Sequence, residues 1–195
     1  MQQAQQTPSQ QQQQQHASTG ITQAIAKLKE LGINFLALDF DQTILDVHTR
    51  GCWQGTLEEL YPHVRPVFAH LIEAAVQEGD MYVAIVTFSR QIHFVRGVLD
   101  QIVGPEAAQH IPIRGGDRSW NYTGAGRVFG KQGHMASAVE ELESRNPGLE
   151  ITRNTTLLID DDQRNIRHAL NSNTRALWFN PDRPHRLLQD IMKLV

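Results

Sequence analysis

Cysteine is almost missing from this sequence of 195 residues. The one cysteine, Cys52, has no second thiol to pair with, which excludes an intrachain disulfide and fits a reducing compartment. Long apolar runs are missing as well. None reaches the roughly 18 residues of a membrane-spanning helix, and no basic segment followed by an apolar stretch opens the chain as in a secretory signal. We therefore expect a soluble, cytoplasmic protein with no membrane partner.

The sequence also lacks a strong net charge. It has 18 lysines and arginines against 21 aspartates and glutamates, which gives a formal net charge of −3 with the two signs interspersed. Nucleic-acid binding through the phosphate backbone depends on a marked excess of basic residues. We therefore expect no nucleic-acid partner, and the sequence leaves the oligomeric state open.

The beginning of the chain has no charged side chains. Its first sixteen residues contain ten glutamines and no Asp, Glu, Lys or Arg. Such a tract has too little apolar surface to bury, which is typical of disordered segments. We predict a Gln-rich disordered tail over residues 1–17 and one folded domain over residues 18–195, a length that suffices for a core of its own.

Within this domain, short apolar runs alternate with segments of helical periodicity. Buried strands that alternate with amphipathic helices are typical of a parallel sheet covered on both faces. We predict an α/β, Rossmann-like sheet of about five parallel strands. The expected strands are 34–39, 81–87, 110–114, 155–160 and 175–180, and the expected helices are 18–31, 66–78, 90–102, 131–145, 163–170 and a last one from 184 onward.

Polar side chains follow three of these strands where each strand ends. In parallel sheets the carboxyl ends of the strands share one edge, and ligands bind beyond it. Residues two apart, such as Asp39 and Asp41, lie on the same side of an extended backbone. The polar residues at this edge would be Asp39, Asp41, Thr87, Ser89, Asp160, Asp161 and Asp162, with Lys131 at the start of the helix before the fourth strand.

Five acidic groups near one point repel one another unless a cation lies between them. Their hard oxygen donors, with no His or Cys at ligand spacing, favour Mg²⁺ over zinc or copper. The hydroxyl of Thr87 and the ammonium of Lys131 are suitable donors to phosphate oxygens. Asp39 can then act as a nucleophile and form an aspartyl-phosphate.

In this order the segments resemble the haloacid dehalogenase (HAD) superfamily. DFDQT, from Asp39, is similar to its DxDxT motif; VAIVT, ending at Thr87, to its second motif; Lys131 to its conserved lysine; and LLIDDDQRNI to its acidic fourth motif. The resemblance covers about residues 33–180 and is greatest to the magnesium-dependent phosphatase branch. The short span between Asp41 and Met81 leaves no room for a large cap domain.

The resemblance implies a role for each acid. Asp39 would attack phosphorus and bind Mg²⁺. Asp41 would protonate the leaving oxygen, activate water afterwards and offer its backbone carbonyl to the metal. Asp161 would be a metal ligand, and Asp160 either an outer ligand or an alternative one.

For the residues that would donate hydrogen bonds to the phosphoryl group, the sequence leaves alternatives open. Thr87 would bind the phosphoryl group, and Ser89 either binds it too or caps the next helix. Lys131 would hold both the phosphoryl group and the nucleophile, and it competes for that role with Arg118 and Arg127.

The sequence thus predicts a magnesium-dependent phosphomonoesterase whose open site accepts a phosphoprotein or a small phosphorylated metabolite. A phosphoacceptor receiver domain uses similar residues, but it has adjacent acids first and a lone aspartate later, which is the reverse of the order seen here. The remaining alternative is a catalytically inactive HAD-fold binding or scaffold protein.

Overall fold

A parallel five-stranded sheet forms the centre of the protein. The computed structural model describes residues 8–122 and 129–195. All pairings in the sheet are parallel, and the strand order is β3-β2-β1-β4-β5. The predicted α/β fold with a sheet of five parallel strands is confirmed. The strands are β1 (Phe35–Leu38), β2 (Tyr82–Val86), β3 (Ile113–Arg114), β4 (Thr156–Asp160) and β5 (Arg175–Trp178).

Helices connect these strands. In the part of the chain that the structure describes, no helix is both long enough and apolar enough to cross a membrane. The helices are α1 (Pro8–Glu30), α2 (Leu57–Leu60), α3 (Pro66–Glu78), α4 (Ile92–Val103), α5 (Pro105–Ala108), α6 (Gln132–Arg145), α7 (Gln163–Asn171) and α8 (Leu187–Ile191). Single helical turns lie at η1 (Phe40–Ile44), η2 (Tyr61–His63), η3 (Arg153–Thr155) and η4 (Pro184–Arg186).

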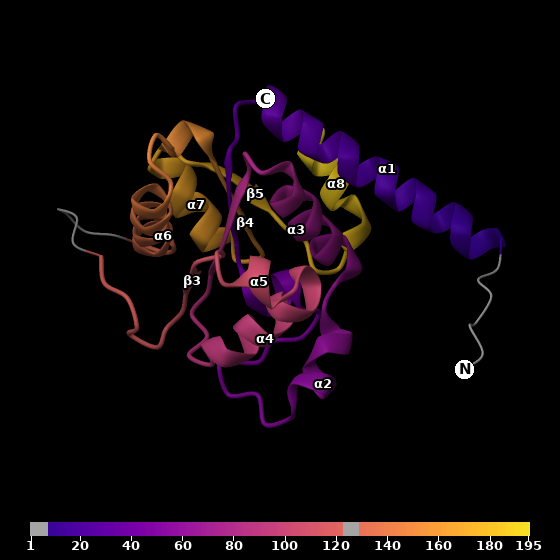
Figure 1. The fold of residues 1–195 in the computed structure, drawn as a ribbon, viewed down its shortest axis with the longest axis horizontal. Coiled ribbons are helices and arrows are strands. Elements are labelled where there is room, and N and C mark those ends of the chain that lie inside the picture. The colour runs from indigo at the N-terminus through magenta and orange to yellow at the C-terminus, as the bar shows by residue number, and fades with distance from the viewer. Residues whose placement is uncertain (1–7, 123–128) are drawn as a thin grey trace.

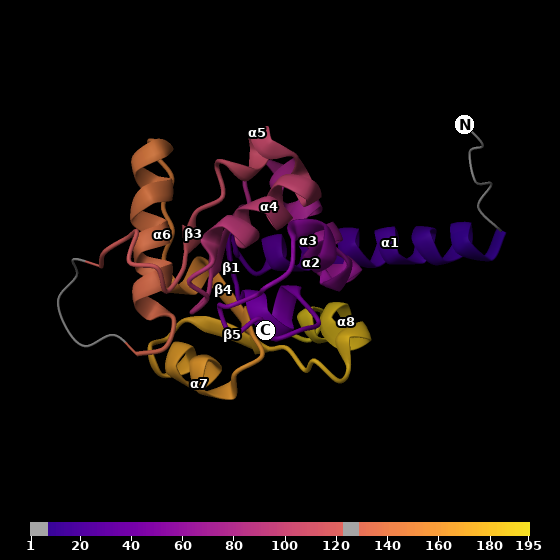
Figure 2. The same ribbon diagram turned by 90° about the horizontal axis from the view of Figure 1, so that it is seen from below.

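Both faces of the sheet are buried because successive side chains of a strand point to opposite sides. Leu36 and Leu38 of β1 pack with α1, α3, α4 and α8 in one apolar cluster. Phe35 and Ala37 of the same strand pack with α6 and α7 in a second cluster. Figures 1 and 2 show α6 and α7 on the side of the sheet opposite to α1 and α3. The predicted helical cover on both faces is therefore confirmed.

The strand order reverses at β1. The chain passes from β1 to β2 and β3 on one side and then returns to β4 and β5 on the other side of β1. In open parallel sheets, such a reversal leaves a crevice at the carboxyl ends of the two strands that flank it. The segment from η1 to β2 holds only α2, η2 and α3, and Phe68 of α3 packs in the core.

The first helix is longer than the sequence predicts. It begins at Pro8, whereas the apolar periodicity predicts a start at Ser18. Glutamine has a good helix propensity, and a helix that has nucleated on the packed face at Ile25 and Leu28 can extend backwards through such residues. Residues 1–7 of the expected disordered tail lie outside the described residues. The division into a tail of residues 1–17 and a domain of residues 18–195 remains a prediction.

Replacing Phe68 by alanine should destabilise the protein by about 3–5 kcal/mol. The Phe68 ring is fully buried and lies edge-on to the ring of Phe179, with 5.0 Å between the ring centroids. Urea unfolding of the two proteins would measure the loss. Met192→Ala serves as the control, because this side chain is 47% exposed and its truncation should change stability by less than about 0.5 kcal/mol. Equal losses in the two variants would contradict the packing described here.

Candidate active site

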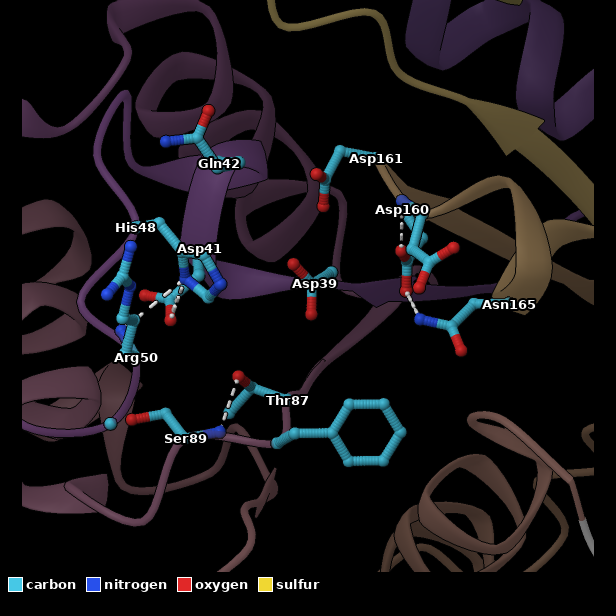
Figure 3. A pocket seen from close by; sticks show the side chains of 13 residues that line it. Asp39, Asp41, Gln42, His48, Arg50, Thr87, Ser89, Asp160, Asp161 and Asn165 are labelled. Atoms are coloured by element: carbon cyan, nitrogen blue, oxygen red, sulfur yellow. Dashed lines mark hydrogen bonds and ion pairs between the residues drawn. The ribbon is translucent and has the colours of Figure 1, made fainter.

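A cavity of about 530 Å³ lies at the carboxyl ends of β1, β2 and β4. Figure 3 shows its side chains converging from η1, from the loop after β2 and from the loop after β4. This is the edge of the sheet at which the sequence predicts the site. The residues that line the cavity are Asp39, Asp41, Gln42, His48, Arg50, Gly51, Thr87, Phe88, Ser89, Asp160, Asp161, Asp162 and Asn165.

A buried ion pair lies at the base of the site. The ammonium of Lys131 donates to Asp39 Oδ1 at 2.9 Å and to the carbonyl of Val86 at 2.7 Å. Lys131 is fully buried, and its Nζ lies 4.0 Å from the centroid of the Phe88 ring. A buried ammonium needs such partners because desolvation of an unpaired charge costs several kcal/mol or more. The pair fixes Lys131 beside one oxygen of Asp39.

Three carboxylates gather next to this pair. One oxygen from each of Asp39, Asp160 and Asp161 lies within 4.8 Å of the other two. Burial, followed by the charge of Asp39, raises the pKa of Asp160 to about 7 and that of Asp161 to about 6. Burial also raises the pKa of Asp39, although the charge of Lys131 opposes this rise. Without a cation, the cluster therefore favours bound protons.

Hydrogen bonds hold the acids of the β4 loop in place. Asp160 accepts from the backbone N–H of Asp162 at 2.8 Å and from Asn165 Nδ2 at 2.9 Å. Asp161 Oδ1 accepts from the Thr43 hydroxyl at 3.3 Å, and its carbonyl accepts from Trp178 Nε1 at 2.8 Å. Apart from the N–H of Asp162, which lies in the loop itself, these contacts come from three other elements, η1, β5 and α7, so the fold holds the loop in place.

The cluster fits a divalent cation with hard oxygen ligands. Its donors are carboxylates alone, and their mutual repulsion is relieved when a cation lies between them. The sequence names Asp39, Asp161 and the backbone carbonyl of Asp41 as metal ligands and leaves Asp160 open. In the structure, Asp160 belongs to the same cluster as the other two. Asp162 instead accepts from the backbone N–H of Arg164 at 2.8 Å and caps α7.

Asp41 lies on another side of the cavity. Its carboxylate accepts from Thr49 Oγ1 at 2.7 and 3.0 Å and lies 3.0 Å from His48 Nδ1. The turn η1 produces this separation, because Asp41 has an extended ψ of 134° and Gln42 a left-handed φ of 60°. The side chain of Asp41 is not part of the three-carboxylate cluster.

The hydroxyls after β2 are poised to donate. Thr87 Oγ1 accepts from the backbone N–H of Ser89 at 3.1 Å, and Ser89 Oγ accepts from the backbone N–H of Gln91 at 3.3 Å. Within residues 8–122 and 129–195, neither hydroxyl has an acceptor for its own hydrogen. Both side chains are buried and line the cavity. Each can therefore give one hydrogen bond to an anion there.

A tight turn closes the Asp41 side of the cavity. The carbonyl of Thr49 accepts from the backbone N–H of Cys52 at 3.1 Å, and both central residues, Arg50 and Gly51, have positive φ of 55° and 64°. A Cβ at Gly51 would lie 3.0 Å from the backbone nitrogen of Arg90. Glycine is therefore needed for the turn to lie against the loop after β2.

The residues of this turn are not among the site residues that the sequence predicts. Thr49 and His48 carry no motif, and their contacts depend on the turn's backbone conformation. A Gly next to a polar residue, as in Arg50-Gly51, is the one local sign of such a turn.

The ring of Phe88 lies over the ammonium of Lys131 and packs against the ring of His134. His134 lies between Phe88 and Trp120, with ring centroids at 5.2 and 4.5 Å. Burial lowers the pKa of His134 to about 3, and the charges of Lys131 and Arg114 act in the same direction. The His134 ring is therefore neutral at ordinary pH and packs between two aromatic rings.

The predicted site residues mostly come together. The acids at the ends of β1 and β4 and the hydroxyls after β2 line one cavity, and Lys131 lies directly beneath it in contact with Asp39. Of the competing cations, Arg118 is exposed and does not line the cavity. Arg127 lies outside the described residues.

Comparisons with known proteins give only loose likenesses. No protein-family model matches the chain, and it matches no curated protein sequence. A crystal structure of an uncharacterized protein from Corynebacterium glutamicum is 14% identical, with a TM-score of 0.46, over 84% of this chain and 97% of that one. Two structures of the HAD domain of the effector protein Lem4 from Legionella pneumophila, one an inactive mutant, are 14% and 15% identical. Their TM-scores are 0.39 and 0.37, over 76% of this chain and 86% and 85% of theirs. At these values the likenesses do not bear on what this chain does.

The metal-free protein should lose stability as the pH rises from about 4 to 7 through the Asp160 carboxyl. Its pKa is about 7 in the folded protein against 3.8 ordinarily, so the folded state holds a proton there that the unfolded state has already released. The expected loss is on the order of 4 kcal/mol. His134 acts in the opposite sense, because its pKa is lowered.

Thermal unfolding in EDTA, followed as a function of pH, isolates this contribution by comparison with Asp160→Asn. The variant should retain more stability than the native chain at pH 7 relative to pH 5, and Mg²⁺ should restore the stability of the native chain at pH 7. Asp182→Asn, at an exposed carboxylate, should keep the native pH dependence. An Asp160→Asn profile parallel to that of the native chain would contradict the assignment.

Proposed function

We propose that this chain is a magnesium-dependent phosphomonoesterase of the HAD type that works through an aspartyl-phosphate. The observation that carries the proposal is the cluster of Asp39, Asp160 and Asp161 within 4.8 Å, with Lys131 2.9 Å from Asp39. Phosphoryl transfer needs mainly positioning and neutralisation of charge on the equatorial oxygens. A cation site beside a nucleophile, an ammonium and two free hydroxyls supplies both.

The phosphoryl group would bind between Asp39 and the loop after β2. Thr87 and Ser89 would each donate a hydroxyl hydrogen to it, and Lys131 would neutralise part of its charge. Asp39 Oδ1 accepts from Lys131, which leaves Oδ2 as the attacking atom. Its attack forms the O–P bond of the aspartyl-phosphate while the bond from phosphorus to the leaving oxygen breaks.

Asp41 would handle the protons of both steps. It would give its proton to the leaving oxygen and then take one from the water that hydrolyses the aspartyl-phosphate, so that phosphate leaves and both aspartates return to their first states. Thr49 and His48 hold its carboxylate in one orientation.

Asp39, Asp160 and Asp161, with the backbone carbonyl of Asp41, would hold Mg²⁺. When bound, the ion neutralises charge on the transferred phosphoryl group and polarises its oxygens. The mutual repulsion of the three carboxylates supports a cation here rather than a structural hydrogen-bond network.

The substrate would be a phosphoprotein or a small phosphorylated metabolite in an aqueous, cytoplasmic setting, with no nucleic acid or membrane involved. Support for an open site comes from the short segment between η1 and β2 and from the exposure of Phe88, which is 57% exposed at the rim of the cavity. Together with the motif order, these features favour the magnesium-dependent phosphatase branch with a minimal cap.

Asp39→Asn should lower kcat on an aryl phosphate by at least about a thousandfold, because it removes the nucleophile. A panel of phosphopeptides, sugar phosphates and nucleotides, assayed with Mg²⁺ and with EDTA, would identify the substrate on which to measure this. Acid quenching during turnover of a ³²P-labelled substrate should trap a labelled native protein and no labelled Asp39→Asn protein. Asp182→Asn should keep native kcat, and circular dichroism would verify that the variants fold.

The alternative of an inactive binding or scaffold protein makes the opposite prediction. It would gain support if the native protein with Mg²⁺ hydrolysed no member of the panel and trapped no label. It would be excluded if turnover depended on Mg²⁺ and was lost in Asp39→Asn.

A further inference from the structure

One cation at the rim of the cavity has no anionic partner. Arg50 lines the cavity beside His48 and Asp41 (Figure 3). Among the residues that the structure describes, no carboxylate lies within 4.0 Å of its guanidinium. The nearby acid, Asp41, is instead held by Thr49 and His48. The guanidinium is therefore free to bind an anion that enters from solvent.

The backbone at Arg50 is unfavourable for an arginine. Its φ of 55° lies in the left-handed region, where a Cβ crowds the following carbonyl and glycine is preferred. Residues other than glycine with such backbone angles cluster at functional sites. There the surrounding structure holds the strained backbone and so fixes where the side chain lies. Arg50 belongs to the same turn as Gly51, whose own φ is 64°.

This turn holds Arg50 in a fixed place relative to the predicted general acid. Thr49, the residue before it, donates to both oxygens of Asp41. Gly51, the residue after it, packs against the backbone of Ser89 and Arg90. The backbone of Arg50 therefore cannot move far from Asp41 without breaking one of these contacts.

The position relative to Asp41 indicates which part of a substrate Arg50 meets. Thr87, Ser89 and Lys131 supply donors for the phosphoryl oxygens on one side of the cavity. Asp41 would protonate the leaving oxygen, so its side of the cavity faces the leaving group. Arg50 lies in the turn that holds Asp41 and that packs against Ser89, so its exposed guanidinium would meet the leaving group beyond the phosphoryl group.

We infer that Arg50 is a specificity-determining residue that selects phosphomonoesters whose leaving group carries a second anion, a carboxylate or a phosphate. The inference rests on the proposed function for the placement of the phosphoryl group. A guanidinium matches either anion because its N–H groups can donate two parallel hydrogen bonds to oxygens of the same group. A neutral leaving group of the same size would gain nothing from it.

Binding of alkyl phosphonates to the full-length protein with Mg²⁺ tests this without turnover, because the C–P bond is not hydrolysed. Calorimetry would compare 2-carboxyethyl phosphonate with 3-methylbutyl phosphonate, an isostere in which an uncharged isopropyl group replaces the carboxylate. A third compound, 4-carboxybutyl phosphonate, would test a greater distance between the phosphonate and the carboxylate. We expect the native protein to bind one of the carboxylated compounds about fivefold more tightly than the isostere, the upper end for an exposed ion pair. This preference should shrink as the salt concentration is raised about tenfold, from roughly 0.05 to roughly 0.5 M, because the screening length becomes shorter.

Arg50→Gly is the decisive variant, since it removes the cation and relieves the backbone at the same time. The turn should therefore persist, and the binding of 3-methylbutyl phosphonate should stay unchanged while the preference for the carboxylate disappears. Arg118→Gly is the matched control. Arg118 is another exposed arginine with a left-handed φ, of 65°, but it does not line the cavity, so its replacement should leave the preference intact.

Two results would overturn the inference: equal affinity of the native protein for 3-methylbutyl phosphonate and for every compound with a second anion, an alkane bisphosphonate included, or a preference that survives in Arg50→Gly. An alkane bisphosphonate in place of the carboxylated compounds distinguishes a second phosphate from a carboxylate, and a preference for either supports the inference. Failure of the proposed function is separate. A native protein that prefers the charged phosphonates through Arg50 but hydrolyses no phosphomonoester would keep this inference and lose the enzymatic activity.

Discussion

The buried pair of Lys131 and Asp39 is the interaction on which the candidate site depends. An ammonium with no exposed surface is stable only if anions and carbonyls surround it, and here Asp39 and the carbonyl of Val86 do so. The pair compensates only one of the three clustered carboxylates. Within the described residues, Asp160 and Asp161 form no ion pair of their own, and burial, followed by the charge of Asp39, raises the pKa of both. Clustering of carboxylates in this way lowers the stability of the fold, and a divalent cation bound between them would restore it.

The parallel sheet explains why the charges meet there. β1 and β4 are neighbours in register, so Leu38 lies beside Ile159 and the residues that follow both strands emerge together. The strand order reverses at β1, so the helices on either face diverge and leave room above this edge. The acidic cluster is therefore a product of topology. It would not survive a slip in strand register, which would also turn the apolar residues of β1 away from both clusters of the core.

Much of this arrangement could be predicted from the sequence because it follows from periodicity. Apolar runs give the strands, their polar ends give the edge of the sheet, and the edge brings together residues as distant as Asp39 and Asp160. The start of α1 could not be found in this way, since glutamine tolerates helix and coil alike. The contacts of Thr49 and the exposure of Arg50 also escaped prediction. They depend on positive φ angles at both Arg50 and Gly51. Only the glycine at position 51 indicates such an angle in the sequence.

The cavity has two sides with different electrostatics, and η1 separates them. On one side Asp39 and the acids after β4 share a volume that suits a cation. On the other side Asp41 turns away, because Gln42 adopts a left-handed φ, and meets a hydroxyl and an imidazole instead of other carboxylates. Two aspartates two residues apart thus have different partners: Asp39 contacts Lys131, and Asp41 contacts Thr49 and His48. The same separation places the turn that carries Arg50 next to Asp41. A single backbone feature of five residues, η1, therefore gives the two carboxylates different surroundings.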